Sequence, residues 1–278
     1  MKKLVTILSF AVVVLLPLNR AAAQAPLVAP GDVTMGHVHL AVTEVDANKK
    51  FWIAMGGTPV TLGSGATAIE GVSFGNVRVL LRKADNVGPA MGSGINHIGF
   101  YVPNVKVAIA KWNAMGLKTA PGRDDQQSFV WTPGDLLRVE ILEMPGQTAP
   151  IVFHHVHFFE TANAAGGLPE MEAWYTKMFG TVPGKRAGYD TGTVPGGEMT
   201  FTKSDTPVVP TAGRAVDHIG FYIKNLEAYC KTLEANGVKL DMPYTKRPDL
   251  GLAIAFITDP WGTRIELNEP LTQSSEVR

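Results

Sequence analysis

Histidines open four short apolar segments of the sequence, and two of these segments are followed later by a glutamate that lies between aliphatic residues. The four segments begin at His37 (HVHLAV), His97 (HIGFYV), His155 (HVHFFE) and His218 (HIGFYI). Arg138-Val139-Glu140 follows the second segment, and Arg264-Ile265-Glu266 follows the fourth. Two histidines and one carboxylate can bind one face of a divalent transition metal ion and leave other coordination positions open. The sequence therefore predicts metal binding and contains this set of residues twice.

The alternation of side chains along a β-strand predicts which way these residues point. Residues two apart share a face, so His97 shares its face with Gly99 and Tyr101, while the intervening positions are apolar and suit packing under a helix. Glu140 and Glu266 lie between aliphatic neighbours. We therefore expect each glutamate to point into the same hollow as the histidines, where a carboxylate without a cation is costly to bury.

An internal repeat of four units positions these residues. After each histidine strand the sequence has helical periodicity, over 45–55, 105–115, 171–179 and 226–235, and each of these stretches ends at a glycine. About three short β-rich pieces follow each helix. The first and third units share the HVH strand, whereas the second and fourth share HIGFY and the Arg-x-Glu strand. We therefore expect odd units to pair with even ones, the first with the second and the third with the fourth.

This pairing divides the chain into two domains. The expected ranges are a signal peptide over 1–23, a linker over 24–35, a first domain over 36–146, a linker over 147–150, a second domain over 151–272 and a polar tail over 273–278. The second linker lies in the Pro- and Gly-containing stretch 145–150.

The N-terminus has the features of a secretory signal. Lys2 and Lys3 precede an apolar run over 4–16, and Ala21-Ala22-Ala23 follows as a cleavage site. The run is shorter than the roughly 20 residues that cross a bilayer. We expect cleavage after Ala23, a periplasmic or secreted protein, and no membrane span after cleavage.

Composition excludes several classes of partner. The 25 basic and 25 acidic side chains cancel and form no run of like charge, so the sequence has no basic surface suited to nucleic acid. The hydrophobic content of 45% is typical of a globular protein. We expect no nucleic-acid partner.

The repeated strand-helix-three-strand unit, the histidine strands and the stretch Thr258-Asp259-Pro260-Trp261-Gly262-Thr263-Arg264-Ile265-Glu266 resemble the vicinal oxygen chelate (VOC) superfamily. This superfamily contains glyoxalase I, extradiol dioxygenases and bleomycin-resistance proteins. The resemblance implies an α+β fold in which four βαβββ units form two tandem half-barrels with a metal in each concave floor.

The resemblance also implies the ligands. They are His37, His97 and Glu140 in the first domain, and His155, His218 and Glu266 in the second, which is preferred as the working site because its Asp-Pro-Trp-Gly turn is more regular. Iron(II), manganese(II) and zinc(II) all suit two histidines and a carboxylate.

Further polar residues on the same strand faces are candidates for proton transfer. His157 and Tyr222 are the nearest candidates in the second domain, and His39 and Tyr101 occupy the matching positions in the first. Each of them can instead support a ligand or line the wall of the hollow.

The implied function is metal-dependent chemistry on a small substrate that chelates the ion through two oxygens, of the dioxygenase type or of the lyase or isomerase type. No named member fits closely. Leu80 and Thr200 occupy the positions of glyoxalase I's additional carboxylate ligand, and Phe256 occupies the position of a tyrosine in the extradiol signature. The alternative is a non-catalytic protein that sequesters a small molecule, as bleomycin-resistance proteins do.

Overall fold

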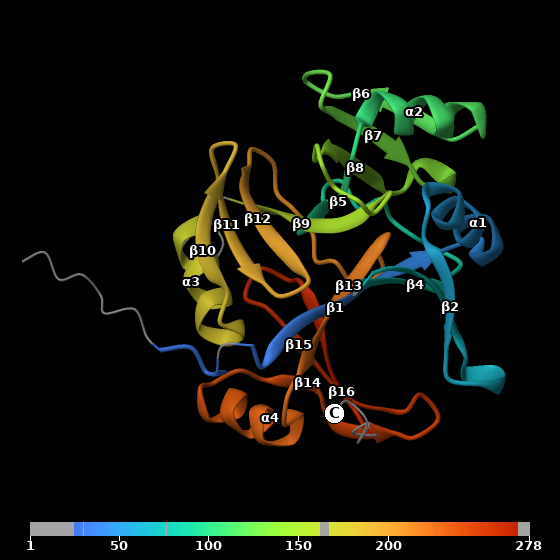
Figure 1. Ribbon diagram of the computed structural model, residues 1–278. Helices are drawn as coiled ribbons and strands as arrows, with labels where there is room; N and C mark the ends of the chain where they lie inside the picture. The colour runs from blue at the N-terminus through green and yellow to red at the C-terminus, as the bar shows by residue number, and fades with distance from the viewer. Residues whose placement is uncertain (1–24, 30, 76, 162–166, 272–278) are drawn as a thin grey trace, which may run out of the picture.

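The computed structural model describes residues 25–271 except residues 30, 76 and 162–166, and over these residues it forms two eight-stranded mixed sheets with four α-helices (Figure 1). The expected α+β class is confirmed. The predicted signal peptide and the polar tail lie outside the described residues. Among the described residues, no helix is long and apolar enough to cross a membrane.

Each repeated unit forms one strand, one helix and three further strands, as expected. The first unit contains β1 (Val33–Val42), α1 (Val45–Met55), β2 (Thr58–Leu62), β3 (Ile69–Phe74) and β4 (Val77–Lys83), and the second contains β5 (Ile95–Val102), α2 (Val105–Ala114), β6 (Lys118–Pro121), β7 (Gln127–Trp131) and β8 (Arg138–Glu143). The third contains β9 (Val152–Thr161), α3 (Leu168–Phe179), β10 (Val182–Arg186), β11 (Tyr189–Val194) and β12 (Gly197–Ser204), and the fourth contains β13 (Val216–Ile223), α4 (Leu226–Ala235), β14 (Leu240–Arg247), β15 (Leu252–Thr258) and β16 (Arg264–Pro270). Two short 3-10 helices, η1 (Gly65–Thr67) and η2 (Pro133–Asp135), lie in connections.

The units pair differently from the expectation. The first sheet has the order β14-β15-β16-β13-β1-β4-β3-β2 and joins the first unit to the fourth, whereas the second sheet has the order β10-β11-β12-β9-β5-β8-β7-β6 and joins the second unit to the third. Odd units do pair with even ones, but the expected pairing of the first with the second and of the third with the fourth is wrong. Neither 36–146 nor 151–272 therefore forms a sheet of its own.

Chain connectivity explains this error. Short connections favour neighbours in space, and this rule is satisfied equally well when the second unit pairs with the third through the connection over 144–151. The first and fourth units then remain to pair with each other.

The histidine strands lie at the centre of each sheet. β1 pairs antiparallel with β13, and the parallel neighbours β4 and β16 flank them. β9 and β5 pair in the same way between β12 and β8. The residues on these four strands are consequently buried on both faces, which makes them a rigid platform for a site.

Helices α1 and α3 cover one face of their own units' strands and join the cores of the two sheets. Trp52 of α1 is fully buried, and its ring lies 5.9 Å from that of Phe100 on β5. Phe179 of α3 stacks on Phe221 of β13 with the ring centroids 4.5 Å apart. Full burial of one such side chain contributes roughly 1.5–3 kcal/mol. Trp52 and Trp112 are both buried core residues.

Candidate metal centres

Two groups of three histidines and one glutamate lie on the faces of the sheets that α1 and α3 leave free. The first site contains His37, His39, His218 and Glu266, and the second site contains His97, His155, His157 and Glu140. Seven of the eight side chains are buried, and that of Glu266 is 13% exposed. Within each site, the candidate ligand atoms all lie within 4.8 Å of one another.

The expected grouping of histidines with glutamates is wrong, because it followed the wrong pairing of units. His155 lies with Glu140 and His97, not with His218 and Glu266. His37 lies with His218 and Glu266. The six residues expected to be ligands are nevertheless all present in the two sites.

In the first site, Glu266 bridges two strands. Its Oε2 lies 2.9 Å from Nε2 of His218 and 3.3 Å from Nε2 of His37. Nδ1 of His39 lies 3.1 Å from the same nitrogen of His218.

The second site repeats this geometry. Oε2 of Glu140 lies 3.0 Å from Nε2 of His155 and 3.4 Å from Nε2 of His97. Nδ1 of His157 lies 3.1 Å from that nitrogen of His97. Each position in one site thus has a counterpart in the other.

These separations fit a shared divalent ion. Ligand bonds of roughly 2.0–2.2 Å in a tetrahedral site place neighbouring ligand atoms about 3.3–3.5 Å apart. In addition, Nε2 of His37 and Nε2 of His155 are buried and have no hydrogen-bond partner among the described residues. Buried polar atoms are normally satisfied, and a metal ion bound here would satisfy both nitrogens.

Glycine in the HIG motif makes room for a histidine of the neighbouring strand. A Cβ atom on Gly220 would lie 2.0 Å from Cε1 of His37, and one on Gly99 would lie 2.0 Å from Cε1 of His155. Only glycine therefore allows these rings to lie across the adjacent strand. The sequence displayed this signal twice, in both HIGFY segments, but its meaning depends on the strand pairing.

The arginine of each Arg-x-Glu strand stacks on an aromatic ring of the neighbouring strand. The guanidinium of Arg264 lies 4.4 Å from the ring centroid of Phe256, and Arg138 lies at the same distance from that of Phe129. This stacking is a cation–π contact.

Amides bind the glutamate oxygen that points away from the histidines. Nδ2 of Asn268 donates to Oε1 of Glu266 at 2.7 Å, and Nε2 of Gln127 donates to Oε1 of Glu140. One oxygen of each glutamate remains directed at the histidines, which favours monodentate coordination.

Burial keeps most of the histidines neutral. It lowers the pKa of His155 to about 3 and that of His157 to about 2, and it also lowers the pKa of His39 and His97. His218 is the exception: burial opposes its charge, but hydrogen bonds to Asp217 and Glu266 raise its pKa.

The glutamates are ionised. Burial alone would raise the pKa of Glu140 and Glu266, but the close contact of Glu140 with His155 and the hydrogen bond of Glu266 with His218 lead the effects that hold both pKa values below the usual range. Neutral imidazoles beside an ionised carboxylate are the protonation states that metal binding requires.

The candidates for proton transfer face the two hollows, in different sites. Nε2 of His157 lies 2.7 Å from Oγ1 of Thr202 in the second site. Tyr222 lines a small cavity of the first site, where its hydroxyl accepts a hydrogen bond from Arg78. Leu80 and Thr200 lie on the neighbouring strands, opposite His39 and His157.

Sequence reasoning missed His154. A β-bulge in β9 adds one residue between Phe153 and His155, so His154 turns to the same side as its neighbour, and its Nδ1 lies 2.8 Å from Nδ1 of His155. Its ring lies 4.0 Å from that of Tyr101. Three histidines within 154–157 were the available signal, but strict alternation places His154 on the wrong face.

A fold of paired half-barrels with a His and Glu cluster in each floor defines a class of metal-chelating proteins, and the comparisons agree. The sequence model of the Glyoxalase/Bleomycin resistance protein/Dioxygenase superfamily matches residues 94–267, more than half of the chain. The chain belongs to this superfamily. No curated protein matches the sequence.

Solved structures share the fold at low sequence identity. Glyoxalase I from Zea mays is 17% identical with a TM-score of 0.67, over 85% of this chain and 92% of that one. A putative dioxygenase from Bacillus subtilis subsp. subtilis str. 168 is 12% identical with a TM-score of 0.64, over 86% of each chain. At these identities the likeness concerns the fold alone.

Proposed function

We propose that this protein is a metal-dependent enzyme that acts on a small molecule able to chelate the ion through two oxygens. The observation that carries the proposal is the pair of clusters in which an ionised glutamate faces histidine nitrogens, two of which, Nε2 of His37 and Nε2 of His155, are buried without a hydrogen-bond partner among the described residues. Membership of the superfamily supports the proposal, because glyoxalases and dioxygenases are among its members.

The ligands follow from the observed grouping. His37, His218 and Glu266 would hold one ion, and His97, His155 and Glu140 would hold another. Iron(II), manganese(II) and zinc(II) all suit these donors. When bound, such an ion stabilises negative charge that develops on substrate oxygens.

The remaining polar groups can move or hold a proton. His157 stays neutral at physiological pH, because burial lowers its pKa to about 2, so it can accept a hydrogen bond from a substrate hydroxyl. In the first site, Arg78 donates to the oxygen of Tyr222, and this leaves the tyrosine's own proton free to be donated. These roles suit ring-opening dioxygenation as well as lyase or isomerase chemistry.

Metal content and ligand binding test the proposal together. Elemental analysis of the purified protein should find divalent transition metal, and acetohydroxamate, a two-oxygen chelator, should bind the metal-loaded protein. The double variant Glu140→Gln/Glu266→Gln should lose both, because glutamine keeps the shape but not the charge. A folded parent protein that binds no divalent metal would overturn the proposal.

Turnover separates catalysis from sequestration. Oxygen uptake with a catechol tests the dioxygenase branch, and exchange of the carbon-bound proton of an α-hydroxyketone with D2O tests the isomerase branch. Tight binding of such molecules without conversion would favour the sequestering alternative.

We further propose that the protein is exported, on the basis of the basic, apolar and Ala-rich order of residues 1–23. The mature chain should begin at Gln24 and be found in the periplasmic or secreted fraction. N-terminal sequencing that finds Met1 on the accumulated protein would contradict export.

A further inference from the structure

The two sites share their four metal-facing residues but differ in what surrounds them. The residue before the HIG histidine is Asp217 in the first site and Asn96 in the second. The bulged residue before the HVH histidine is Gly36 in the first site and His154 in the second. Each difference changes either the strength of a ligand or access to the ion.

Asp217 strengthens a ligand of the first site. Its Oδ1 lies 2.7 Å from Nδ1 of His218, so the other ring nitrogen is left to face Glu266. Arg82 and Arg264 lie 3.1 and 3.2 Å from this buried carboxylate and stabilise its charge. A carboxylate behind a ligating histidine raises the basicity of the ring and fixes its orientation.

The second site has a neutral amide at this place. Oδ1 of Asn96 lies 2.9 Å from Nδ1 of His97 and also accepts from Arg138 at 3.1 Å. The orientation of the ring is therefore preserved, but the negative charge behind it is missing. We expect the second site to bind the same ion more weakly.

Two hairpins close the first site. The turn after β2 meets the turn after β14, because a Cβ atom on Gly63 would lie 2.8 Å from the carbonyl oxygen of Asp249 (Figure 1, lower right). Beneath them, Leu62 and Leu250 line a cavity of only about 20 Å³ beside His37 and His39. Such a volume holds about one water molecule.

The ring of Tyr222 completes this closure. It lies directly on the backbone of Gly36, where a Cβ atom would lie 2.6 Å from the ring. The first site is thus covered at the bulge as well as between the hairpins.

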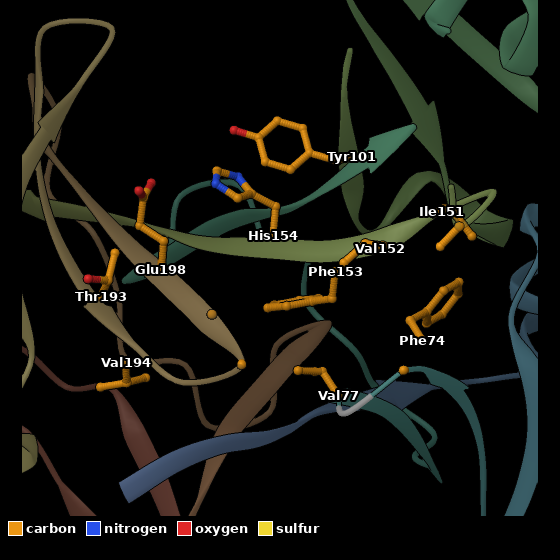
Figure 2. A pocket seen from close by; sticks show the side chains of 14 residues that line it. Phe74, Val77, Tyr101, Ile151, Val152, Phe153, His154, Thr193, Val194 and Glu198 are labelled. Carbon is orange, nitrogen blue, oxygen red and sulfur yellow. The ribbon is translucent and has the colours of Figure 1, made fainter. Parts of the chain in front are cut away.

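A much larger cavity lies beside the second site, and His154 separates it from the four residues of that site. The matching turns after β6 and β10 lie apart (Figure 1). At the bulge, His154 and Tyr101 form the polar rim of a cavity of about 550 Å³, together with Glu198 (Figure 2). Apolar side chains that include Phe74 and Phe153 line the remainder. His154 connects this cavity to the metal ligand His155.

We propose that the two sites have different tasks: the first holds its ion tightly as a structural element, and the second holds its ion more weakly and receives the substrate. The substrate enters through the cavity beside His154. We therefore expect it to carry two vicinal oxygens and an apolar group about the size of an aromatic ring. This division of tasks rests on the proposed function, and it assigns Asp217 as a positioning residue.

Competition with a chromophoric chelator tests the difference in affinity without any activity assay. The parent protein loaded with zinc should release one ion readily and the other about 10–100-fold less readily, the range typical of such a second partner. Asp217→Asn should weaken the tight ion only. Asn96→Asp should raise the affinity of the second site for its ion. This variant keeps the test decisive if Asp217→Asn fails to fold.

Binding of acetohydroxamate locates the accessible ion. Glu140→Gln should abolish this binding, whereas Glu266→Gln should retain it and lose the tight ion. Two ions of equal affinity in the parent, or hydroxamate binding that depends on Glu266, would overturn the division of tasks while leaving the proposed function intact. Failure of the proposed function would instead appear as a parent that binds no ion.

Discussion

Adding a single methyl group to the HIG motif should remove one ion from the protein. In Gly220→Ala the new Cβ atom would lie 2.0 Å from Cε1 of His37, and in Gly99→Ala it would lie 2.0 Å from Cε1 of His155. Carbon atoms in contact normally lie about 3.5–4.0 Å apart, so each ring must move by about 1.5–2 Å.

That displacement is far larger than a metal site tolerates. Ligand distances vary by only about 0.2 Å in functional sites, so each variant should lose one ligand and at least about 100-fold in affinity at one site. Overpacking of this kind also costs about 1–3 kcal/mol of stability.

Elemental analysis after passage over a desalting column measures the outcome. Each single variant should retain one ion per chain and the double variant none. Gly57→Ala is the matched control, because its Cβ atom would lie 2.2 Å from Cγ1 of Val72, away from both sites. Retention of both ions at the affinity of the parent protein in Gly220→Ala would refute the assigned geometry.

Three further outcomes are expected. The pKa values of His155 and His157 are about 3 and about 2, whereas a histidine in an unfolded chain has a pKa of about 6.5. As the pH falls below 6.5, the unfolded state therefore binds more protons than the folded state. The metal-free protein should therefore lose about 2 kcal/mol per histidine between pH 6.5 and pH 5, measured by urea unfolding with a chelator present, and a gain would contradict this. Because the second site is the one proposed to receive the substrate, Tyr222→Phe should change neither turnover nor metal content, whereas Glu140→Gln should abolish turnover; turnover lost in Tyr222→Phe and kept in Glu140→Gln would contradict the division of tasks. Trp52→Ala should lower the free energy of unfolding by about 3–5 kcal/mol and leave the ion count unchanged, because this fully buried ring lies in the helix-covered core.

Local patterns in the sequence predicted the units well. Helix periods, glycine stops such as Gly56 and Gly180 in left-handed conformations, and alternation along the histidine strands all depend on residues close together in the chain. The same alternation correctly placed His37, His97 and Glu140 on the faces that carry the two clusters. All six residues expected to be ligands lie in these clusters for this reason.

The partnership between units could not be predicted in this way. Whether His155 meets Glu140 or Glu266 depends on which sheets form, and both arrangements satisfy the same strand patterns and short connections. The bulge that turns His154 towards the site also depends on the partner strand, because only the pairing of β9 with β5 leaves a residue unopposed.

The Asp-Pro-Trp-Gly turn has a structural role that the sequence did not reveal. Its regularity favoured the glutamate after it as the working site, but Asp259 accepts hydrogen bonds from the backbone of Trp261 and Thr263 and from the hydroxyl of Tyr175 in α3. The turn therefore connects the third and fourth units, and its regularity has a structural cause that says nothing about catalysis.

A crystal structure of the zinc- or manganese-loaded protein, with an anomalous difference map, tests the central claim most directly. We predict two peaks per chain, one within about 2.0–2.3 Å of ligand atoms of His37, His218 and Glu266, and one at the same distances from His97, His155 and Glu140. A peak shared by His155 and His218, or loaded protein without a peak at either glutamate, would contradict the account.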